Sequence, residues 1–223
     1  MRKPTIHGDL TLTWNVKCSC YTLNLPARLS CPGVQERMKD PKAICNFCYA
    51  WSSNFRLPNS ARILKANFKY IMAYNWRAIA DALLRAIDSI PRKDRGYFRF
   101  FASGDIPNQA FATSILYVAR HNPKTWFWLP TQNRRAYDEI LYGHRLKNLT
   151  VRFSTPRIND PAPYGGSMVY TGKPPERHHV CKGKCIDCRE CWLNPKIRIA
   201  YKFHGSACTK NIFHKAKRVG GWR

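Results

Sequence analysis

The chain has 223 residues, a length that suits one medium-sized domain. Hydrophobic residues make up 44% of it, which is enough for a real core and excludes a disordered chain. Lys and Arg number 38 against 13 Asp and Glu, so the formal net charge is +25. Uncompensated charge of this size predicts a polyanionic partner, either nucleic acid (DNA or RNA) or a phosphorylated substrate. A generally basic, solvated surface is the alternative.

Two features of the sequence bear on where the protein acts. No run of eighteen apolar residues occurs, so we expect no membrane span. The first ten residues, MRKPTIHGDL, lack the apolar stretch of a secretory signal, so we expect a cytoplasmic protein. The basic character increases toward the end, because no acidic residue follows Glu190 while eight basic residues do: Lys196, Arg198, Lys202, Lys210, Lys215, Lys217, Arg218 and Arg223.

Hydrophobic periodicity predicts alternating strands and helices along the chain. Near residue 10 the stretch LTLTW alternates like a short strand, and a cysteine-containing loop follows over 24–51. An apolar stripe from Leu64 to Ile87 predicts one long helix over 60–90, capped by Ser60 and stopped by Pro91. Beyond it we expect further strands at 97–102, 125–130, 149–154, 167–172 and 196–203, with helices after Asn108 and over 134–146.

This order of elements predicts an α/β fold with a parallel sheet. About six strands favour a partial parallel β/α barrel over residues 1–175 rather than a complete one. Residues 176–223 then form a cysteine-rich metal-binding segment, the last strand and a basic tail of the same globular unit. In barrels the chemistry lies at the carboxyl ends of the strands. Three arginines follow predicted strand ends as candidate phosphate contacts, with solvated basic loops as the alternative: Arg134, Arg135 and Arg157.

The loop over 24–51 contains Cys31, Cys45 and Cys48. Ten cysteines in a reducing compartment favour metal ligands or redox groups over disulfides. A structural zinc site prefers four closed ligands, whereas three thiolates suit a [4Fe-4S] cluster that leaves one iron open. A zinc site completed by Cys18 or Cys20 is the alternative.

The ending CNFC, with Phe47 before the last thiol, resembles the signature of radical S-adenosylmethionine enzymes. The first spacing is longer here, with thirteen residues between Cys31 and Cys45. The turn after the predicted strand at 97–102 is similar to the glycine-rich acidic turn of that superfamily and comprises Ser103, Gly104 and Asp105. The resemblance implies that S-adenosyl-L-methionine binds the open iron. It also implies that the turn's backbone approaches the cofactor closely and that its acid accepts from the methionine ammonium.

A second motif places four cysteines within eleven residues, with spacings of three, two and two: Cys181, Cys185, Cys188 and Cys191. Such tight consecutive spacing is typical of ferredoxin-like wrapping of a second [4Fe-4S] cluster, and zinc is the alternative. A full set of four thiolates leaves no open iron and predicts a structural or electron-relay role, like the auxiliary clusters of some radical enzymes. Cys18 and Cys20 fit a redox dithiol or spare ligands, and we expect Cys208 to be a buried apolar residue.

Several stretches together resemble an uncharacterised phage gene-product family over roughly residues 24 to 204: NLPA, SCPG, CNFCYA, FRFFASGD, the second cysteine motif and KFHG. This resemblance implies a virus or mobile-element origin, hence the host-cell cytoplasm, and no particular activity. Our interpretation is an iron–sulfur protein resembling radical S-adenosylmethionine enzymes, supplied by an electron donor and acting on nucleic acid or a nucleotide. The alternative is a non-enzymatic, metal-stabilised nucleic-acid-binding protein.

Overall fold

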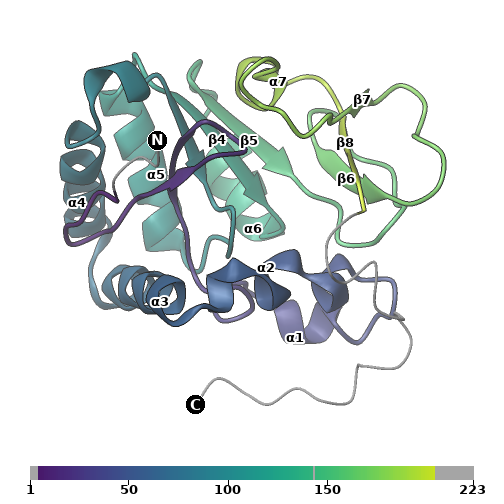
Figure 1. The fold of residues 1–223 in the computed structure, drawn as a ribbon, viewed down its shortest axis with the longest axis horizontal. Helices are drawn as coiled ribbons and strands as arrows, with labels where there is room; N and C mark the ends of the chain where they lie inside the picture. Colours follow the sequence, from purple (N-terminus) through teal and green to yellow (C-terminus); the bar gives the residue numbers. More distant parts are fainter. Residues whose placement is uncertain (1–4, 143, 204–223) are drawn as a thin grey trace.

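The computed structural model describes residues 5–142 and 144–203, and shows a mixed α/β protein (Figure 1). The expected basic tail beyond residue 203 and Cys208 lie outside the described residues. The main sheet has five strands in the order β1-β2-β3-β4-β5, with β1 antiparallel to β2 and the remaining pairs parallel. These strands are β1 (Thr13–Asn15), β2 (Cys20–Leu23), β3 (Tyr97–Phe100), β4 (Trp126–Thr131) and β5 (Leu149–Phe153).

A second, smaller sheet follows in the chain and contains three parallel strands in the order β6-β8-β7. These are β6 (Ser167–Tyr170), β7 (His179–Val180) and β8 (Ile199–Lys202). A single parallel bridge between Ser154 and Ser167 joins the end of β5 to the start of β6. The small sheet therefore continues from the carboxyl end of the main sheet, as Figure 1 shows.

Helices connect the parallel strands of the main sheet. Two helices, α3 (Pro58–Ala73) and α4 (Trp76–Asp88), lead from β2 to β3, and α5 (Gln109–His121) leads from β3 to β4. The next connection is α6 (Arg134–Ala136), which continues into the π-helical segment η4 (Tyr137–Tyr142). Short helical turns complete the fold: α1 (Val34–Arg37), η1 (Ile44–Phe47), α2 (Tyr49–Ser52), η2 (Asn54–Arg56), η3 (Arg92–Asp94) and α7 (Glu190–Leu193).

The long helix expected over 60–90 is two helices, so that prediction was wrong. The break falls at Asn75, whose side chain accepts hydrogen bonds from the backbone N–H groups of Arg77 (3.0 Å) and Ala78 (3.1 Å). Asparagine favours this capping position, because its side chain satisfies N–H groups that the first helical turn leaves without partners. The apolar stripe continues across the break and conceals it in the sequence. Helix α3 begins earlier than expected, with Pro58 in its first turn.

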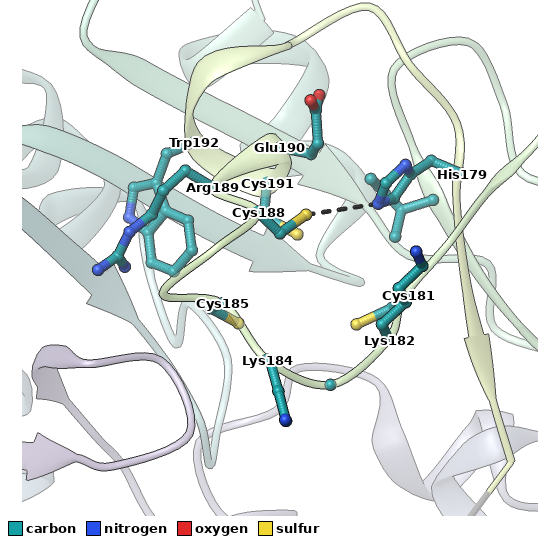
Figure 2. A pocket seen from close by; sticks show the side chains of 12 residues that line it. His179, Cys181, Lys182, Lys184, Cys185, Cys188, Arg189, Glu190, Cys191 and Trp192 are labelled. Atoms are coloured by element: carbon teal, nitrogen blue, oxygen red, sulfur yellow. Dashed lines mark hydrogen bonds between the residues drawn. The ribbon is translucent and has the colours of Figure 1, made fainter.

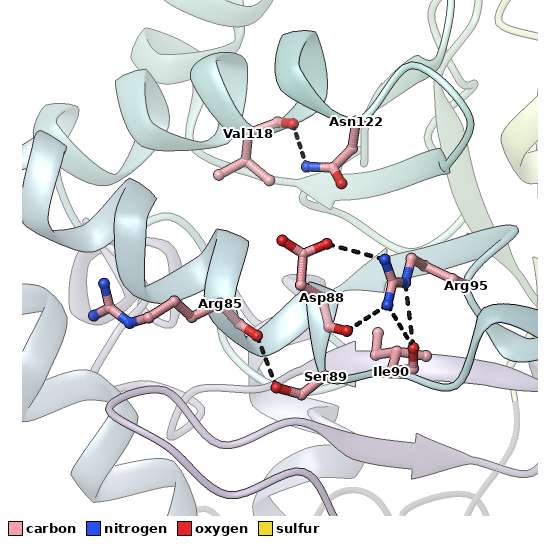
Figure 3. A network of polar contacts seen from close by, with 7 residues as sticks. All are labelled: Arg85, Asp88, Ser89, Ile90, Arg95, Val118 and Asn122. Atoms are coloured by element: carbon pink, nitrogen blue, oxygen red, sulfur yellow. Dashed lines mark hydrogen bonds and ion pairs between the residues drawn. The ribbon is translucent and has the colours of Figure 1, made fainter.

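The end of α4 is fixed by one arginine, shown in Figure 3. The guanidinium of Arg95 donates to the Asp88 carboxylate (2.9 Å) and to the backbone carbonyls of Asp88 and Ile90. These carbonyls lie at and just beyond the helix end, where intrahelical partners are missing. Arg95 therefore ties the end of α4 to the segment that leads into β3.

The main sheet presents two different faces, because side chains alternate along each strand. One face carries Phe98 and Phe100 of β3 and Phe127 and Leu129 of β4, which pack into a core with α4 and α5. The opposite face carries the intervening residues of β3 and β4, and Trp128 there packs in a second cluster with Trp192 and several cysteines. Helices thus cover one face, and the C-terminal cysteine segment covers the other.

The expected α/β class and mostly parallel sheet are confirmed, but the described strands do not show a partial barrel. They form an open five-stranded sheet and a separate three-stranded one. The physical reason lies after β5, where three short strands pair with one another in a second sheet instead of extending the first one. Across the described residues, no helix is both long and apolar enough to cross a membrane.

Candidate metal centre at the strand ends

A cavity of about 420 Å³ lies at the carboxyl ends of the parallel strands. Its walls include the turn after β3, the end of β4 at Thr131 and Gln132, and Ser154 after β5. Cysteines from three separate segments also line it: Cys18, Cys31, Cys45, Cys48, Cys181, Cys185 and Cys191. The fold therefore brings both cysteine motifs to one cavity, at the edge where sequence patterns predicted the chemistry.

The first motif is held in place by the loop that follows β5. Residues Ala43 and Arg157 form an antiparallel bridge, and the N–H of Ile44 donates to the carbonyl of Pro156 at 2.8 Å. The Cys45 thiol donates to the Gln132 side-chain oxygen at 3.4 Å, which connects the motif to the end of β4. These contacts position Cys31, Cys45 and Cys48 around one side of the cavity, although long stretches of sequence separate them from β4 and β5.

Burial controls the protonation of these thiols. It raises the pKa of Cys31 to about 12, with the nearby Asp105 charge adding to the effect. Burial also raises the pKa of Cys48. Both thiols are therefore protonated at neutral pH in the metal-free protein, and a soft metal must displace their protons when it binds.

The turn Ser103-Gly104-Asp105 is built into the protein by its own hydrogen bonds. The Asp105 carboxylate accepts from the Thr131 hydroxyl (2.6 Å) and from the backbone N–H groups of Ile106 (2.8 Å) and Gln132 (2.9 Å). The Ser103 hydroxyl donates to the Leu25 carbonyl at 2.8 Å. The acid thus links the ends of β3 and β4. Its burial raises its pKa, and these hydrogen bonds oppose the rise.

The second motif wraps around a smaller cavity of about 20 Å³, shown in Figure 2, that all four of its cysteines line. The Cys191 sulfur lies 3.4 Å from the hydroxyl of Tyr201, which lines the large cavity. The Cys188 sulfur lies 3.4 Å from Nε2 of His179, so this histidine is a partner of the motif rather than a solvated loop residue. Three of the four, Cys181, Cys185 and Cys191, also line the large cavity.

Cys18 was expected as a redox thiol or spare ligand, and the structure places it against the second motif. Its sulfur lies 4.0 Å from the Cys185 sulfur and 3.2 Å from Nη1 of Arg99. The Cys185 thiol donates toward Cys18 and lowers the pKa of Cys18, and the guanidinium of Arg99 contributes further. Arg99 in turn stacks on Trp128, with its Cζ 4.3 Å from the ring centre.

Sequence reasoning missed two arginines at this centre: Arg152 holds the second motif against the main sheet, and Arg99 contacts Cys18 and Trp128. Arg152 of β5 is fully buried and donates to four backbone carbonyls, those of Gly165, Glu190, Asn194 and Ile197. Arg99 comes from β3. In YFRFF, Arg99 lies between two phenylalanines, so strand alternation places it on the face of the sheet opposite to theirs. In LTVRF, alternation places Arg152 in the same way, and the sequence carries no other sign of a role for either arginine. The carbonyl partners of Arg152 are far away in the chain and cannot be read locally.

The three candidate phosphate contacts are instead engaged with carboxylates. Arg134 pairs with Asp138, Arg135 with Glu139 at 3.0 Å, and Arg157 with Asp40 at 2.8 Å. None of these three arginines lines the large cavity. The remaining predicted cofactor contact, Phe47, does line the cavity, and its ring centre lies 5.7 Å from that of Phe203.

Within residues 5–142 and 144–203, no three His, Cys, Asp or Glu side chains are grouped closely enough to hold one metal ion. A closed zinc site needs its four ligands about 2.3 Å from a single ion. In a [4Fe-4S] cluster each thiolate binds a different iron, so the thiolates lie further apart. Thiols spread around a roomy cavity fit clusters of this kind.

Comparison with known proteins gives one finding. The model of a phage gene-product family, Gene product 88, matches residues 2–180. The chain belongs to the Gene product 88 family. The match includes the first cysteine motif, the Ser103–Asp105 turn and Arg152, and it ends immediately before Cys181. No curated protein and no solved structure matches the chain.

Proposed function

We propose that this member of the Gene product 88 family is an iron–sulfur enzyme of the radical S-adenosylmethionine type, acting on nucleic acid or a nucleotide. One observation supports it above all: two cysteine motifs open into a single cavity at the carboxyl ends of parallel strands. A cavity in this position is where α/β proteins carry their chemistry. Its volume of about 420 Å³ suits a bound small molecule.

In this proposal Cys31, Cys45 and Cys48 hold one [4Fe-4S] cluster, and the iron without a cysteine is left for the cofactor. When bound, the cluster and S-adenosylmethionine together supply one-electron radical chemistry. The protein positions the ligands and excludes water from the cavity. Apolar side chains of the first motif and of the strand ends serve that purpose, among them Phe47, Ala50 and Phe101, which all line the cavity.

The turn after β3 contributes in two ways. Ser103 and Gly104 keep the turn against Leu25, so their role is to hold its shape. Asp105 faces the cavity and its Oδ2 accepts one hydrogen bond, from the N–H of Gln132. A carboxylate oxygen accommodates about two donors, so Oδ2 retains an acceptor position for the methionine ammonium. Asp105 is therefore both a cross-link between strands and the proposed contact of the cofactor.

The charges around the cavity support an anionic substrate. Among the described residues, four cationic side chains, Lys17, Arg37, Arg99 and Lys202, line it, against the one carboxylate of Asp105. Positive charge at the site favours phosphate groups and raises the local concentration of anions. The same cations offset the negative charge of thiolate-bound clusters. The second motif, in this proposal, carries the auxiliary cluster beside this basic wall.

Anaerobic calorimetry with S-adenosylmethionine tests this function. The cluster-loaded protein should bind it. Cys48→Ala should lose binding along with the first cluster, because an iron loses its ligand. Asp105→Asn should keep both clusters and weaken binding by about tenfold to a hundredfold, the loss expected when a charge-assisted hydrogen bond of roughly 1.5–3 kcal/mol is removed. Asparagine is preferable to alanine here, because it retains a hydrogen-bonding group for the strand cross-link.

A second candidate is a non-enzymatic nucleic-acid-binding protein whose metal centres stabilise the fold. The net charge of +25 favours it, as does the way the second motif covers a whole face of the sheet. Cluster-loaded protein that binds nucleic acid but no S-adenosylmethionine would support this candidate and reject the enzyme.

A further inference from the structure

The turn between β1 and β2 delivers a cysteine to the second motif. Cys18 is 1% exposed, and its sulfur lies 4.0 Å from that of Cys185, although 167 residues separate the two in the chain. Both side chains line the large cavity, together with Cys181 and Cys191. Four thiols from two distant segments therefore face one space.

Hydrogen bonds that do not involve the thiols hold these two segments together. The N–H of Cys185 donates to the carbonyl of Lys17 at 3.4 Å, and Nη1 of Arg189 donates to the carbonyl of Cys18 at 2.7 Å. The N–H of Cys18 is bound by the Asn15 side chain at 3.1 Å, which fixes the turn itself. The position of Cys18 beside the motif is thus a feature of the folded backbone and does not depend on a bound metal.

Cys188 is placed differently from the other three cysteines of its motif. Its sulfur contacts Nε2 of His179 at 3.4 Å, and Figure 2 shows it directed toward that ring. It lines the small cavity of about 20 Å³, whereas the lining of the large cavity comprises Cys181, Cys185 and Cys191. A site that faces the large cavity therefore receives three thiols from the motif and needs a fourth from elsewhere.

We propose that the fourth thiolate of the second metal centre is Cys18, and that Cys188 and His179 lie outside its ligand set. The guanidinium of Arg99, 3.2 Å from the Cys18 sulfur, offsets part of the negative charge of the four thiolates. Docking of the C-terminal segment onto β1 and β2 then closes the site, so metal binding fastens the last part of the chain to the first. The assignment rests on the metal-thiolate centre of the proposed function.

Metal analysis can isolate this centre. In a background where Cys31, Cys45 and Cys48 are all serine, the remaining iron or zinc belongs to the second centre. Adding Cys18→Ser should lower that metal content at least tenfold. Adding Cys188→Ser should leave it unchanged. Cys20→Ser is the matched control, because Cys20 is equally buried two residues away and is not among the residues that line the cavity. Far-UV circular dichroism confirms that each variant is folded.

A second measurement uses the unmutated, metal-loaded protein and so avoids any failure to fold. Alkylation followed by peptide mass mapping should modify Cys188 and leave Cys181, Cys185 and Cys191 protected. Removal of the metal by a chelator should then expose those three. Loss of metal on Cys188→Ser, protection of Cys188 by metal, or a background protein that binds no metal would each overturn the assignment. Failure to bind S-adenosylmethionine would reject the proposed function and leave this result unaffected.

Discussion

At the scale of single residues, the turn after β3 needs glycine at position 104 because of its backbone conformation and its close neighbours. Gly104 has a φ of +89°, and a Cβ there would lie 2.6 Å from the Ser30 hydroxyl and 2.8 Å from the Leu25 carbonyl. The resemblance to radical enzymes implied close approach to a cofactor at this glycine. Gly104 does lie close to other atoms, but these atoms belong to Leu25 and Ser30 in the segment after β2. The conformation and the crowding both require glycine.

Gly104→Ala should therefore be more destabilising than an alanine at a glycine with the same backbone but open surroundings. Gly172 provides that control, because its φ is +75° and a Cβ there would meet no atom of a non-adjacent residue within 4 Å. The backbone conformation costs roughly 1–2 kcal/mol in both variants. Crowding adds roughly 1–3 kcal/mol at Gly104 alone. Urea unfolding of the two metal-loaded variants measures the difference, and equal losses would show that crowding is unimportant.

Residue types and local spacing pointed to the cysteines that line the large cavity, and their role as metal ligands stays a prediction. Six of the seven predicted ligands line the cavity, and Cys188 is directed toward His179. The roles of Cys18 and Arg152 could not be predicted, since each depends on contacts with residues that are distant in the sequence. The arginines expected to contact phosphate each pair with a carboxylate, four residues along the chain for Arg134 and Arg135 and far away in the sequence for Arg157, and their binding to phosphate stays a prediction.

At the scale of elements, two strands were missed, the two-residue β7 and, more important for the site, β2. Its sequence, CYTL, is short and all four residues are buried, so it lacks the alternation that marks a half-exposed strand. Strand β3 and helix α5 were predicted well, because one alternates clearly and the other begins at the capping residue Asn108, which accepts from the N–H of Phe111. Pairing of β2 with β3 is what places the first cysteine motif at the cavity.

Strand β5 anchors the C-terminal segment through Arg152, and Arg152→Leu should release it. The change removes this donor from four backbone carbonyls; that of Glu190 keeps the N–H of Asn194, and the loss at the other three costs about 1–3 kcal/mol each. We expect the free energy of unfolding to fall by more than about 3 kcal/mol and the second centre to lose metal before the first. Urea unfolding with metal analysis checks both.

Arg120→Leu is the matched control for this change, because Arg120 is exposed on α5. It should leave stability and metal content close to those of the unmutated protein. An effect of Arg152→Leu no larger than that of Arg120→Leu would contradict the anchoring role.

At the scale of the whole molecule, helices cover one face of the main sheet and the C-terminal cysteine segment packs against the other. The regular order of strands and helices along the chain made the parallel α/β class predictable. The sequence could not show that the sheet stays open. The segment after β5 contains strand-like stretches, and how these strands pair depends on the bridge from Ser154 to Ser167. The second sheet arises from this bridge rather than from another helical crossover.

The net charge of +25 belongs to the whole molecule as well. If nucleic acid is the partner, affinity for a labelled oligonucleotide should fall steeply with salt. A protein that neutralises about 6–10 phosphates loses roughly 10³–10⁵ in affinity between 50 and 200 mM salt. Fluorescence anisotropy with single- and double-stranded DNA and RNA measures the slope. A peptide nucleic acid of the same sequence, which has no phosphates, is the control. Absence of binding at low salt to every one of these nucleic acids would contradict the prediction.

The central claim is that two thiolate-bound clusters face one cavity. Purification without oxygen, followed by iron, sulfide and zinc analysis with electron paramagnetic resonance, tests it most directly. The account predicts a brown protein with about eight irons and about eight sulfides per chain, as two [4Fe-4S] clusters require. It also predicts that the spectrum of the reduced protein changes when S-adenosylmethionine is added. Stoichiometric zinc with no sulfide would contradict it.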